Sequence, residues 1–239
     1  MNTTRAYSEG KLRTLPEEGF GASQSNPLGL GRRVLRNRYF VMRHGESEAN
    51  VLGVAVGDPQ TGLEGFGLTD LGRRQVIEAA SSFKKSHTLS LNETEIVSSD
   101  FRRTRETAEL FAKTLGNSVS VRLREGLRER FFGKLEGKDH RTMAALLERE
   151  GMEALSSRYG CERVESVHYR VVRVIRDLEA ERPHRTVILV SHADPIQVLM
   201  AALAGLNVSE CERIAPLDYA EIAELSLGMS LRFKDGRTD

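Results

Sequence analysis

Two short strand-like runs, each ending in a histidine, constrain this chain of 239 residues more than any other feature. The first, Arg38–Met42, leads into Arg43-His44, and the second, Thr186–Val190, leads into Ser191-His192. Short apolar runs rich in β-branched and aromatic residues are typical of buried strands. Ligands of open α/β sheets bind outside the carboxyl ends of the strands. The pattern therefore predicts that His44 and His192 reach the same crevice.

Strand-like and helical patterns alternate along the rest of the chain. Further strands are expected at 95–98 and 119–123, with 221–227 and 230–233 as a closing pair, and helices at about 70–85, 102–115, 141–150, 162–181 and 195–204. Residues 53–72 contain six glycines and are expected to form a long mobile loop. Such alternation is typical of a mostly parallel sheet with helices on both faces. The predicted fold class is α/β, a three-layer sandwich.

The composition limits the classes of protein that remain. Hydrophobic residues make up 39% and charged residues 29%, which is typical of a globular domain, and one domain over residues 37–239 is expected. A net charge of +1 gives no case for a nucleic-acid or membrane-surface partner. The longest apolar run, Val198–Leu206, is too short to span a bilayer. Cys161 and Cys211 form neither a disulfide framework nor a metal-ligand pattern.

Residues 1–36 show no sustained periodicity and are expected to form a flexible extension. They lack the apolar segment of a secretory signal. A transit peptide stays open as an alternative, although Glu9, Glu17 and Glu18 argue against the acid-poor type. Together with the low cysteine count, this favours a protein of the cytoplasm.

Residue types suited to phosphoryl transfer follow the two strand ends. As a neutral imidazole, His44 can attack phosphorus, and His192 can donate a hydrogen bond to a phosphoryl oxygen. The stretch Phe101-Arg102-Arg103 places guanidinium groups at the start of a helix, where free N–H groups also favour an anion. In a predicted loop, Glu129 has the carboxyl group of an acid and base.

Five blocks occur in a fixed order along residues 38–204. They are Arg43-His44-Gly45-Glu46-Ser47-Glu48-Ala49-Asn50, then Gly67-Leu68-Thr69-Asp70-Leu71-Gly72, Ser98–Ala108, Arg128–Gly133 with Leu135-Glu136-Gly137, and Val190-Ser191-His192-Ala193. In this order they resemble the histidine phosphatase superfamily, which includes the cofactor-dependent phosphoglycerate mutases. Phe101, Thr104 and Ala193 depart from the family pattern.

The resemblance implies a phosphoglycerate mutase-like fold and a phosphatase that acts through a phosphohistidine, with no metal ion or other cofactor. The residues that it implicates are His44, Glu129 and His192 as catalytic and Arg43, Asn50 and Arg103 as phosphate-binding. In this scheme Glu129 protonates the leaving group and later activates water. The implied partner is a small phosphorylated substrate, and the oligomeric state stays open.

Neighbouring residues compete for two of these roles. Residues adjacent on a helix point about 100° apart, so only one of Arg102 and Arg103 is expected to face the phosphate, and the motif favours Arg103. Glu125 and Glu136 are the competitors of Glu129. The four other histidines (His87, His140, His168 and His184) have no motif support and are expected to be structural or exposed.

Three functions agree with this pattern. Hydrolysis of phosphate monoesters is favoured over a mutase, because the chain has no tryptophan and Val51–Asp58 does not resemble the segment that follows the opening motif of mutases. A catalytically inactive module that binds phosphorylated ligands is the third alternative. Specificity is expected to lie in residues 51–66 and 138–161, and the arginines of 122–130 hint at a substrate with additional negative charge.

Overall fold

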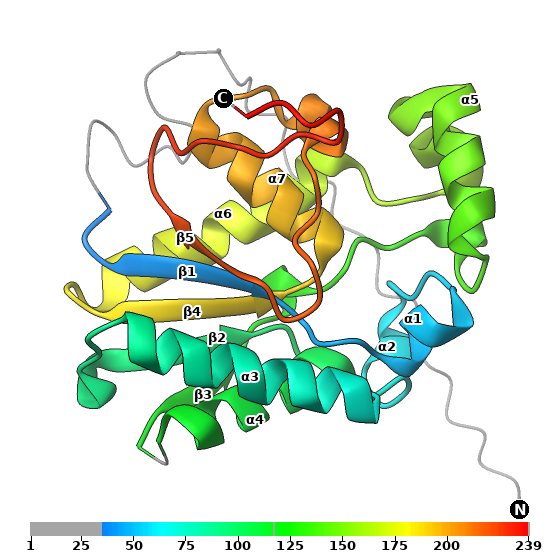
Figure 1. The fold of residues 1–239 in the computed structure, drawn as a ribbon. Helices are drawn as coiled ribbons and strands as arrows, with labels where there is room; N and C mark the ends of the chain where they lie inside the picture. The colour runs from blue at the N-terminus through cyan, green and yellow to red at the C-terminus, as the bar shows by residue number, and fades with distance from the viewer. Residues whose placement is uncertain (1–34, 117, 239) are drawn as a thin grey trace, which may run out of the picture.

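The computed structural model describes residues 35–116 and 118–238 and builds them around a five-stranded sheet (Figure 1). The strands are β1 (Arg38–Arg43), β2 (Thr94–Ser98), β3 (Ser120–Leu123), β4 (Thr186–Ser191) and β5 (Ile222–Leu225). Their order is β3-β2-β4-β1-β5, in which β5 alone runs antiparallel to its neighbour β1. The predicted, mostly parallel sheet is confirmed.

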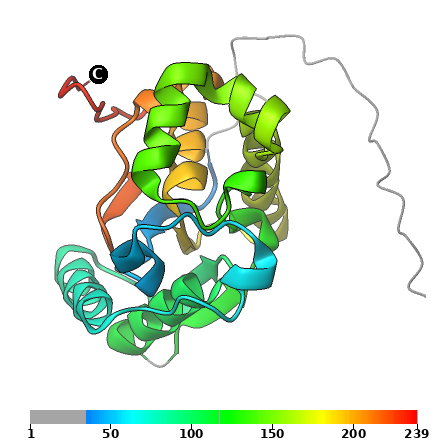
Figure 2. The same cartoon turned by 90° about the vertical axis from the view of Figure 1, so that its right-hand side faces the viewer.

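Helices cover both faces of this sheet. The helices are α1 (Glu48–Leu52), α2 (Pro59–Gly62), α3 (Asp70–Ser86), α4 (Arg102–Leu115), α5 (His140–Tyr159), α6 (Val164–Glu181) and α7 (Ala193–Ala204), with 3₁₀ turns at Leu91–Glu93, Glu125–Leu127, Gly133–Leu135 and Val208–Arg213. One face carries α3 and α4 and the other carries α6 and α7, whereas α1, α2 and α5 lie at the carboxyl ends of the parallel strands (Figures 1 and 2). The three-layer prediction is therefore confirmed.

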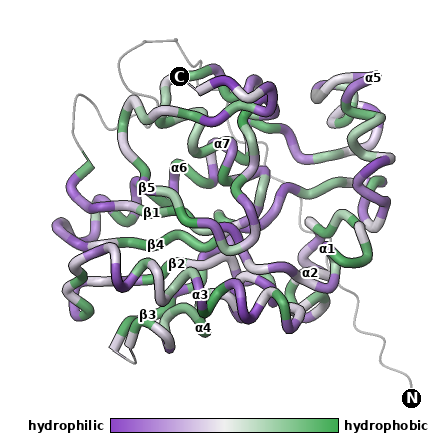
Figure 3. Tube along the Cα trace, viewed as in Figure 1, coloured by the Kyte–Doolittle hydropathy of each residue, from purple (hydrophilic) through white to green (hydrophobic). Residues whose placement is uncertain are grey.

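The pleat of β1 explains why the sheet has two cores. Successive side chains of a strand point to opposite faces. Tyr39 and Val41 pack with the buried stripe of α6 and with α7, while Phe40 and Met42 pack with α3 and α4. Figure 3 shows the hydrophobic segments gathered on the strands and on α7. Burial on both faces accounts for the nearly continuous apolar runs that the sequence displays.

The expected closing pair of strands is wrong in its second half. Residues 222–225 form β5, which pairs with β1, but in 230–233 only isolated bridges form, from Phe233 to Ile214 and from Arg232 to Thr238. Leu231 and Phe233 are buried in the core beneath α6 and α7. Their alternation therefore reflects packing of an irregular segment and not strand pairing.

Three other elements differ from their expected bounds. Helix α7 begins at Ala193, with His192 as its N-cap, and Pro195 lies in the first turn, where a missing N–H breaks no helical hydrogen bond. Helix α5 continues to Tyr159, although Gly151 interrupts it at φ 78° where the predicted helix ended. The expected loop over 53–72 contains the short helix α2, capped by Asp58.

The predicted extension over 1–36 lies almost wholly outside the described residues, which begin at Leu35. Leu35 packs against the core, and the Arg36 backbone N–H donates to the Glu179 carboxylate over 2.9 Å. The extension and the domain boundary at residue 37 therefore stay predictions. Within the described residues, no helix is long and apolar enough to cross a membrane.

Candidate active site

The ends of β1 and β4 bring the two motif histidines together. Arg43 pairs in register with Ser191, and the His44 backbone N–H donates to the Ser191 carbonyl over 3.1 Å. The imidazole rings of His44 and His192 have centroids 5.2 Å apart. The two histidines therefore share one crevice at the carboxyl edge of the sheet, as expected.

Arg103 lies between the two imidazoles. Its Nε–H points at His44 Nε2 over 3.3 Å and at His192 Nδ1 over 3.2 Å, and its Nη2 donates to the Val56 carbonyl. Arg103 Nη1 and Arg43 Nε are buried without a hydrogen-bond partner within the described residues. Buried donors without a partner cost free energy, so both suit a site that receives an anion.

The hydrogen bonds of His44 assign its tautomer. Its Nδ1 lies 2.8 Å from the Gly45 carbonyl oxygen, which can only accept, so Nδ1 carries the proton. The lone pair of Nε2 then faces Arg103 and the cavity. Burial, with the charges of Arg103 and Arg43, holds the pKa of His44 well below its usual range. The ring is therefore neutral at pH 7, and its Nε2 lone pair accepts from the Arg103 Nε–H.

His192 also forms a hydrogen bond with Ser99, which its motif does not predict. Its Nε2 lies 2.9 Å from Ser99 Oγ, and burial and the charge of Arg103 hold the pKa of His192 well below its usual range. A hydroxyl can donate or accept, so Ser99 supports the ring with a proton on either nitrogen. Both side chains are fully buried. Sequence reasoning missed Ser99, although it lies in the Ser98–Ala108 block.

Of the three candidate glutamates, Glu129 lines the cavity that contains His44. Its Oε1 accepts from the Arg130 backbone N–H over 2.9 Å. Burial, reinforced by the charge of Asp194, raises the pKa of Glu129 to about 7. Glu125 is exposed and paired with Arg128, and Glu136 accepts from the backbone N–H groups of Gly57 and Phe132.

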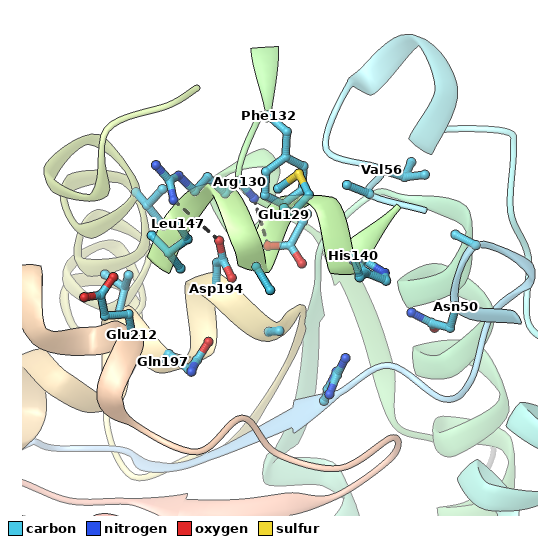
Figure 4. Close-up of a pocket in the computed structure, with 18 of the residues that line it drawn as sticks. Asn50, Val56, Glu129, Arg130, Phe132, His140, Leu147, Asp194, Gln197 and Glu212 are labelled. Carbon is cyan, nitrogen blue, oxygen red and sulfur yellow. Dashed lines mark hydrogen bonds and ion pairs between the residues drawn. The ribbon is translucent and has the colours of Figure 1, made fainter. Parts of the chain in front are cut away.

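Asn50 also faces the cavity, where Figure 4 shows its amide end. Its Oδ1 is occupied, because it accepts from the backbone N–H and the hydroxyl of Ser47 at the start of α1. The Nδ2 donor is thus the end left for a ligand. Sequence reasoning missed helix α1, although the pair Ser47 and Asn50 has the spacing of a capping box.

Glycines join the opening block to the next one. A Cβ on Gly72 would lie 2.0 Å from the Glu46 carbonyl oxygen, and a Cβ on Gly45 would lie 2.7 Å from that of Gly72. Thr69 caps α3 by accepting from the Gly72 N–H and donates to the Glu46 carboxylate over 2.6 Å. The start of α3 therefore packs backbone to backbone on the segment that carries His44.

Arg102 and Arg103 separate as the motif predicts. Arg103 lies in the cavity, whereas Arg102 pairs with Glu106 on the outer side of α4 over 2.8 Å. Three arginines of 122–130 do not line this cavity: Arg122, Arg124 and Arg128, which form ion pairs with Glu95, Glu181, Asp100 and Glu125. Arg130 does line it.

The cavity has a volume of about 300 Å³ and extends from His44 to the side of α5 and α7. Figure 4 shows Glu129, Arg130 and Asp194 close together, with His140 and Asn50 further along the wall. His140 was expected to be structural or exposed; it is exposed, and it also lines the cavity. Asp194 lines it as well and was not singled out. No group of three or more His, Cys, Asp and Glu side chains within the described residues is placed to hold a metal ion.

Comparison with known proteins assigns the family. Residues 39–230 match the model of the histidine phosphatase superfamily, branch 1. The chain belongs to this superfamily. A glucosyl-3-phosphoglycerate phosphatase of Mycolicibacterium vanbaalenii is 30% identical over 200 residues, which cover 79% of this chain and 84% of the relative. A probable phosphoglycerate mutase of Photorhabdus laumondii is 30% identical over 176 residues, or 70% and 74% of the two chains.

A solved structure agrees with this assignment. The mycobacterial glucosyl-3-phosphoglycerate phosphatase, in a complex with VO3, matches with a TM-score of 0.63 and 29% identity over 84% of this chain and 96% of that chain. The phosphoglycerate mutase-like fold is therefore confirmed. Like the mycobacterial phosphatases among these relatives, this member of the superfamily is a phosphatase, a hydrolase of phosphate monoesters.

Proposed function

We propose that this phosphatase transfers the phosphoryl group of a small monoester to His44 Nε2 and then hydrolyses the phosphohistidine. The observation that carries the proposal is the arrangement around Nε2. A neutral imidazole turns its lone pair toward the cavity, and two guanidinium groups bring unpaired N–H donors to the same place. A nucleophile beside preorganised positive charge is what a loose phosphoryl-transfer transition state requires.

The remaining residues supply donors and protons. Arg43, Arg103 and the Asn50 amide hold the equatorial oxygens, and His192 donates to them once its Nδ1 carries a proton. Ser99 supports that tautomer by donating to Nε2. Glu129 gives its proton to the leaving oxygen and takes one from the water that attacks the phosphohistidine. His44 keeps its Nδ1–H on Gly45 throughout, so its Nε2 can form and break the bond to phosphorus.

The substrate that we propose is a phosphate monoester of a hydroxylated alcohol of about the size of a sugar. Several relatives are named for glucosyl-3-phosphoglycerate, so that ester is the first to assay. The relative named as a probable mutase makes isomerisation of phosphoglycerate the second candidate. The absence of tryptophan and the unlike segment Val51–Asp58 favour hydrolysis.

The experiment that tests this proposal is rapid quench with a radiolabelled ester, followed by peptide mapping. The label is expected on His44, lost in acid and retained in alkali, as a phosphoramidate behaves. Label on Ser47, Ser99 or Ser191, which would survive acid, would overturn the covalent mechanism. A parallel assay of phosphate release and of phosphoglycerate isomerisation separates the hydrolase from the mutase.

Location in the cytoplasm is a further part of the proposal. Cys161 and Cys211 are buried and unpaired, which agrees with a reducing compartment. Fractionation of cells that express the full chain, including residues 1–34, tests it.

A further inference from the structure

The cavity continues past Glu129 into a far end that the phosphoryl chemistry does not use. This far end is lined by Asp194 and Gln197 of α7, by Glu212 of the last 3₁₀ turn, and by Arg130 and Lys234. An apolar wall borders the same space, formed by Met143 and Leu147 of α5 and by Val164 and Val167 of α6. Figure 4 shows the carboxyl group of Asp194 beside that of Glu129. Because Glu129 is the proposed acid for the leaving oxygen, the space beyond it is available to the leaving alcohol.

The two ends of the cavity differ in charge. At the phosphoryl end, Arg43 and Arg103 supply two positive charges, and the buried histidines are neutral, which matches one phosphate dianion. At the far end, the basic side chains Arg130 and Lys234 line the same space as an equal number of acidic ones, Asp194 and Glu212.

At the far end, the basic and acidic side chains lie near one another. Arg130 Nη1 lies 3.9 Å from the Asp194 carboxylate. Lys234 and Glu212 line the same end of the cavity. Among the described residues that line this end, the two basic side chains equal the two acidic ones in number. A second anion would therefore have no basic side chain to itself, and a charge without a partner is costly to remove from water.

The far end also offers hydrogen-bond acceptors. Glu212 Oε2 is buried without a hydrogen-bond partner in the described part of the chain. The Gln197 amide nitrogen donates to the Ile214 carbonyl, which leaves its carbonyl oxygen for a ligand. Asp194 contributes a further carboxylate. Hydroxyl groups of a ligand can donate to all three, whereas a carboxylate can donate to none.

We infer that the far end is a leaving-group site for an uncharged polyol, with Asp194 and Glu212 as the residues that exclude a second anionic group. The inference rests on the proposed function and narrows its substrate to the monophosphate of a neutral sugar or polyol. The C–H faces of such an alcohol contact the apolar wall, and its hydroxyls meet the acceptors. Glucosyl-3-phosphoglycerate, whose glycerate carries a carboxylate, is accordingly a slower substrate here than a neutral sugar phosphate.

A matched pair of substrates tests the inference. Glucose 6-phosphate and 6-phosphogluconate have the same carbon chain and phosphate, but the second ends in a carboxylate at the carbon furthest from phosphorus. A carboxylate brought within about 5 Å of another at the far end is repelled strongly enough to expect a ratio of kcat/KM of at least tenfold in favour of glucose 6-phosphate. p-Nitrophenyl phosphate, whose leaving group carries no carboxylate and departs with little help, reports the phosphatase activity itself.

Two variants test which residues cause the preference for glucose 6-phosphate over 6-phosphogluconate. Asp194→Asn and Glu212→Gln each remove one negative charge, and each should lower the ratio at least threefold. The ratio cancels any effect of Asp194 on the acid Glu129, because both substrates need the same proton. Glu210→Gln is the control, since Glu210 lies in the same 3₁₀ turn but is exposed, pairs with Arg213 and does not line the cavity.

The outcomes separate this inference from the proposed function. Loss of all three activities would refute the phosphatase proposal. Hydrolysis of p-nitrophenyl phosphate without a preference for glucose 6-phosphate would overturn the leaving-group site alone. A preference that both variants and the Glu210→Gln control leave unchanged would remove Asp194 and Glu212 from the inference and so overturn it.

Discussion

Replacement of Glu129 by glutamine is the sharpest test of the site. A carboxyl group with the usual pKa of about 4.5 is protonated in roughly one molecule in 300 at pH 7. Burial and the charge of Asp194 raise the pKa of Glu129 to about 7, so about half of the molecules carry the proton. General acid catalysis contributes a factor on the order of 10² to 10⁴, and Glu129→Gln should cost glucose 6-phosphate that much. p-Nitrophenyl phosphate should lose much less, since its phenolate leaves with little help.

The pH dependence gives the same test a second readout. The kcat/KM of the wild type toward a sugar phosphate should fall above about pH 7, as Glu129 loses its proton, and the variant should lack this alkaline limb. Because the pKa of Glu129 is raised in the folded state, the folded chain binds more protons than the unfolded chain between about pH 4.5 and 7. Its contribution to the free energy of unfolding therefore falls as the pH rises. The variant, which lacks this titration, should melt no lower than the wild type at pH 8.

Two neighbouring glutamates serve as controls. Glu125 is exposed in an ion pair with Arg128, and Glu136 accepts two backbone hydrogen bonds. Any loss of activity in Glu125→Gln or Glu136→Gln should therefore be the same for both leaving groups, even if Glu136→Gln lowers the stability of the protein. An equal loss on both substrates for Glu129→Gln would refute its role as the acid. A loss that depends on the leaving group at Glu125 or Glu136 would place the acid at that residue.

Three further predictions follow from the phosphoryl end. His44→Ala should lower turnover to below about 1% while circular dichroism shows a folded protein, and a folded variant that keeps several per cent would contradict the covalent mechanism. Arg103→Ala should weaken inhibition by inorganic phosphate at least tenfold and Arg102→Ala less than twofold, because Arg102 pairs with Glu106 outside the cavity. Ser99→Ala should raise KM about tenfold and shift the nitrogen NMR signals of the His192 ring, and unchanged signals would rule out support of its tautomer.

Much of the fold could be predicted because its three central strands, β1, β2 and β4, are buried on both faces. The run of β4 from Val187 to Ser191 is almost completely buried and could be read as a central strand from composition alone. In Ser230–Phe233, Leu231 and Phe233 alternate with polar residues as in a strand, but the segment packs into the core with isolated bridges only. Periodicity reports which side chains are buried, and it does not report whether the backbone pairs. Short helices such as α1 and α2 leave only a cap to recognise them, since a few residues contain no period.

The two ends of the cavity also differ in how far they could be predicted from the sequence. At the phosphoryl end, the backbone positions the side chains: His44 and His192 follow strands in register, and Arg103 occupies the first turn of α4. Short motifs describe such positions well, because each one spans a strand end or a helix start. At the far end, the lining side chains reach one space only through the packing of α5, α7 and the C-terminal segment, from positions as distant as Arg130 and Lys234. No spacing in the sequence marks that convergence, so the transfer chemistry could be predicted from motifs and the charge balance of the leaving-group site could not.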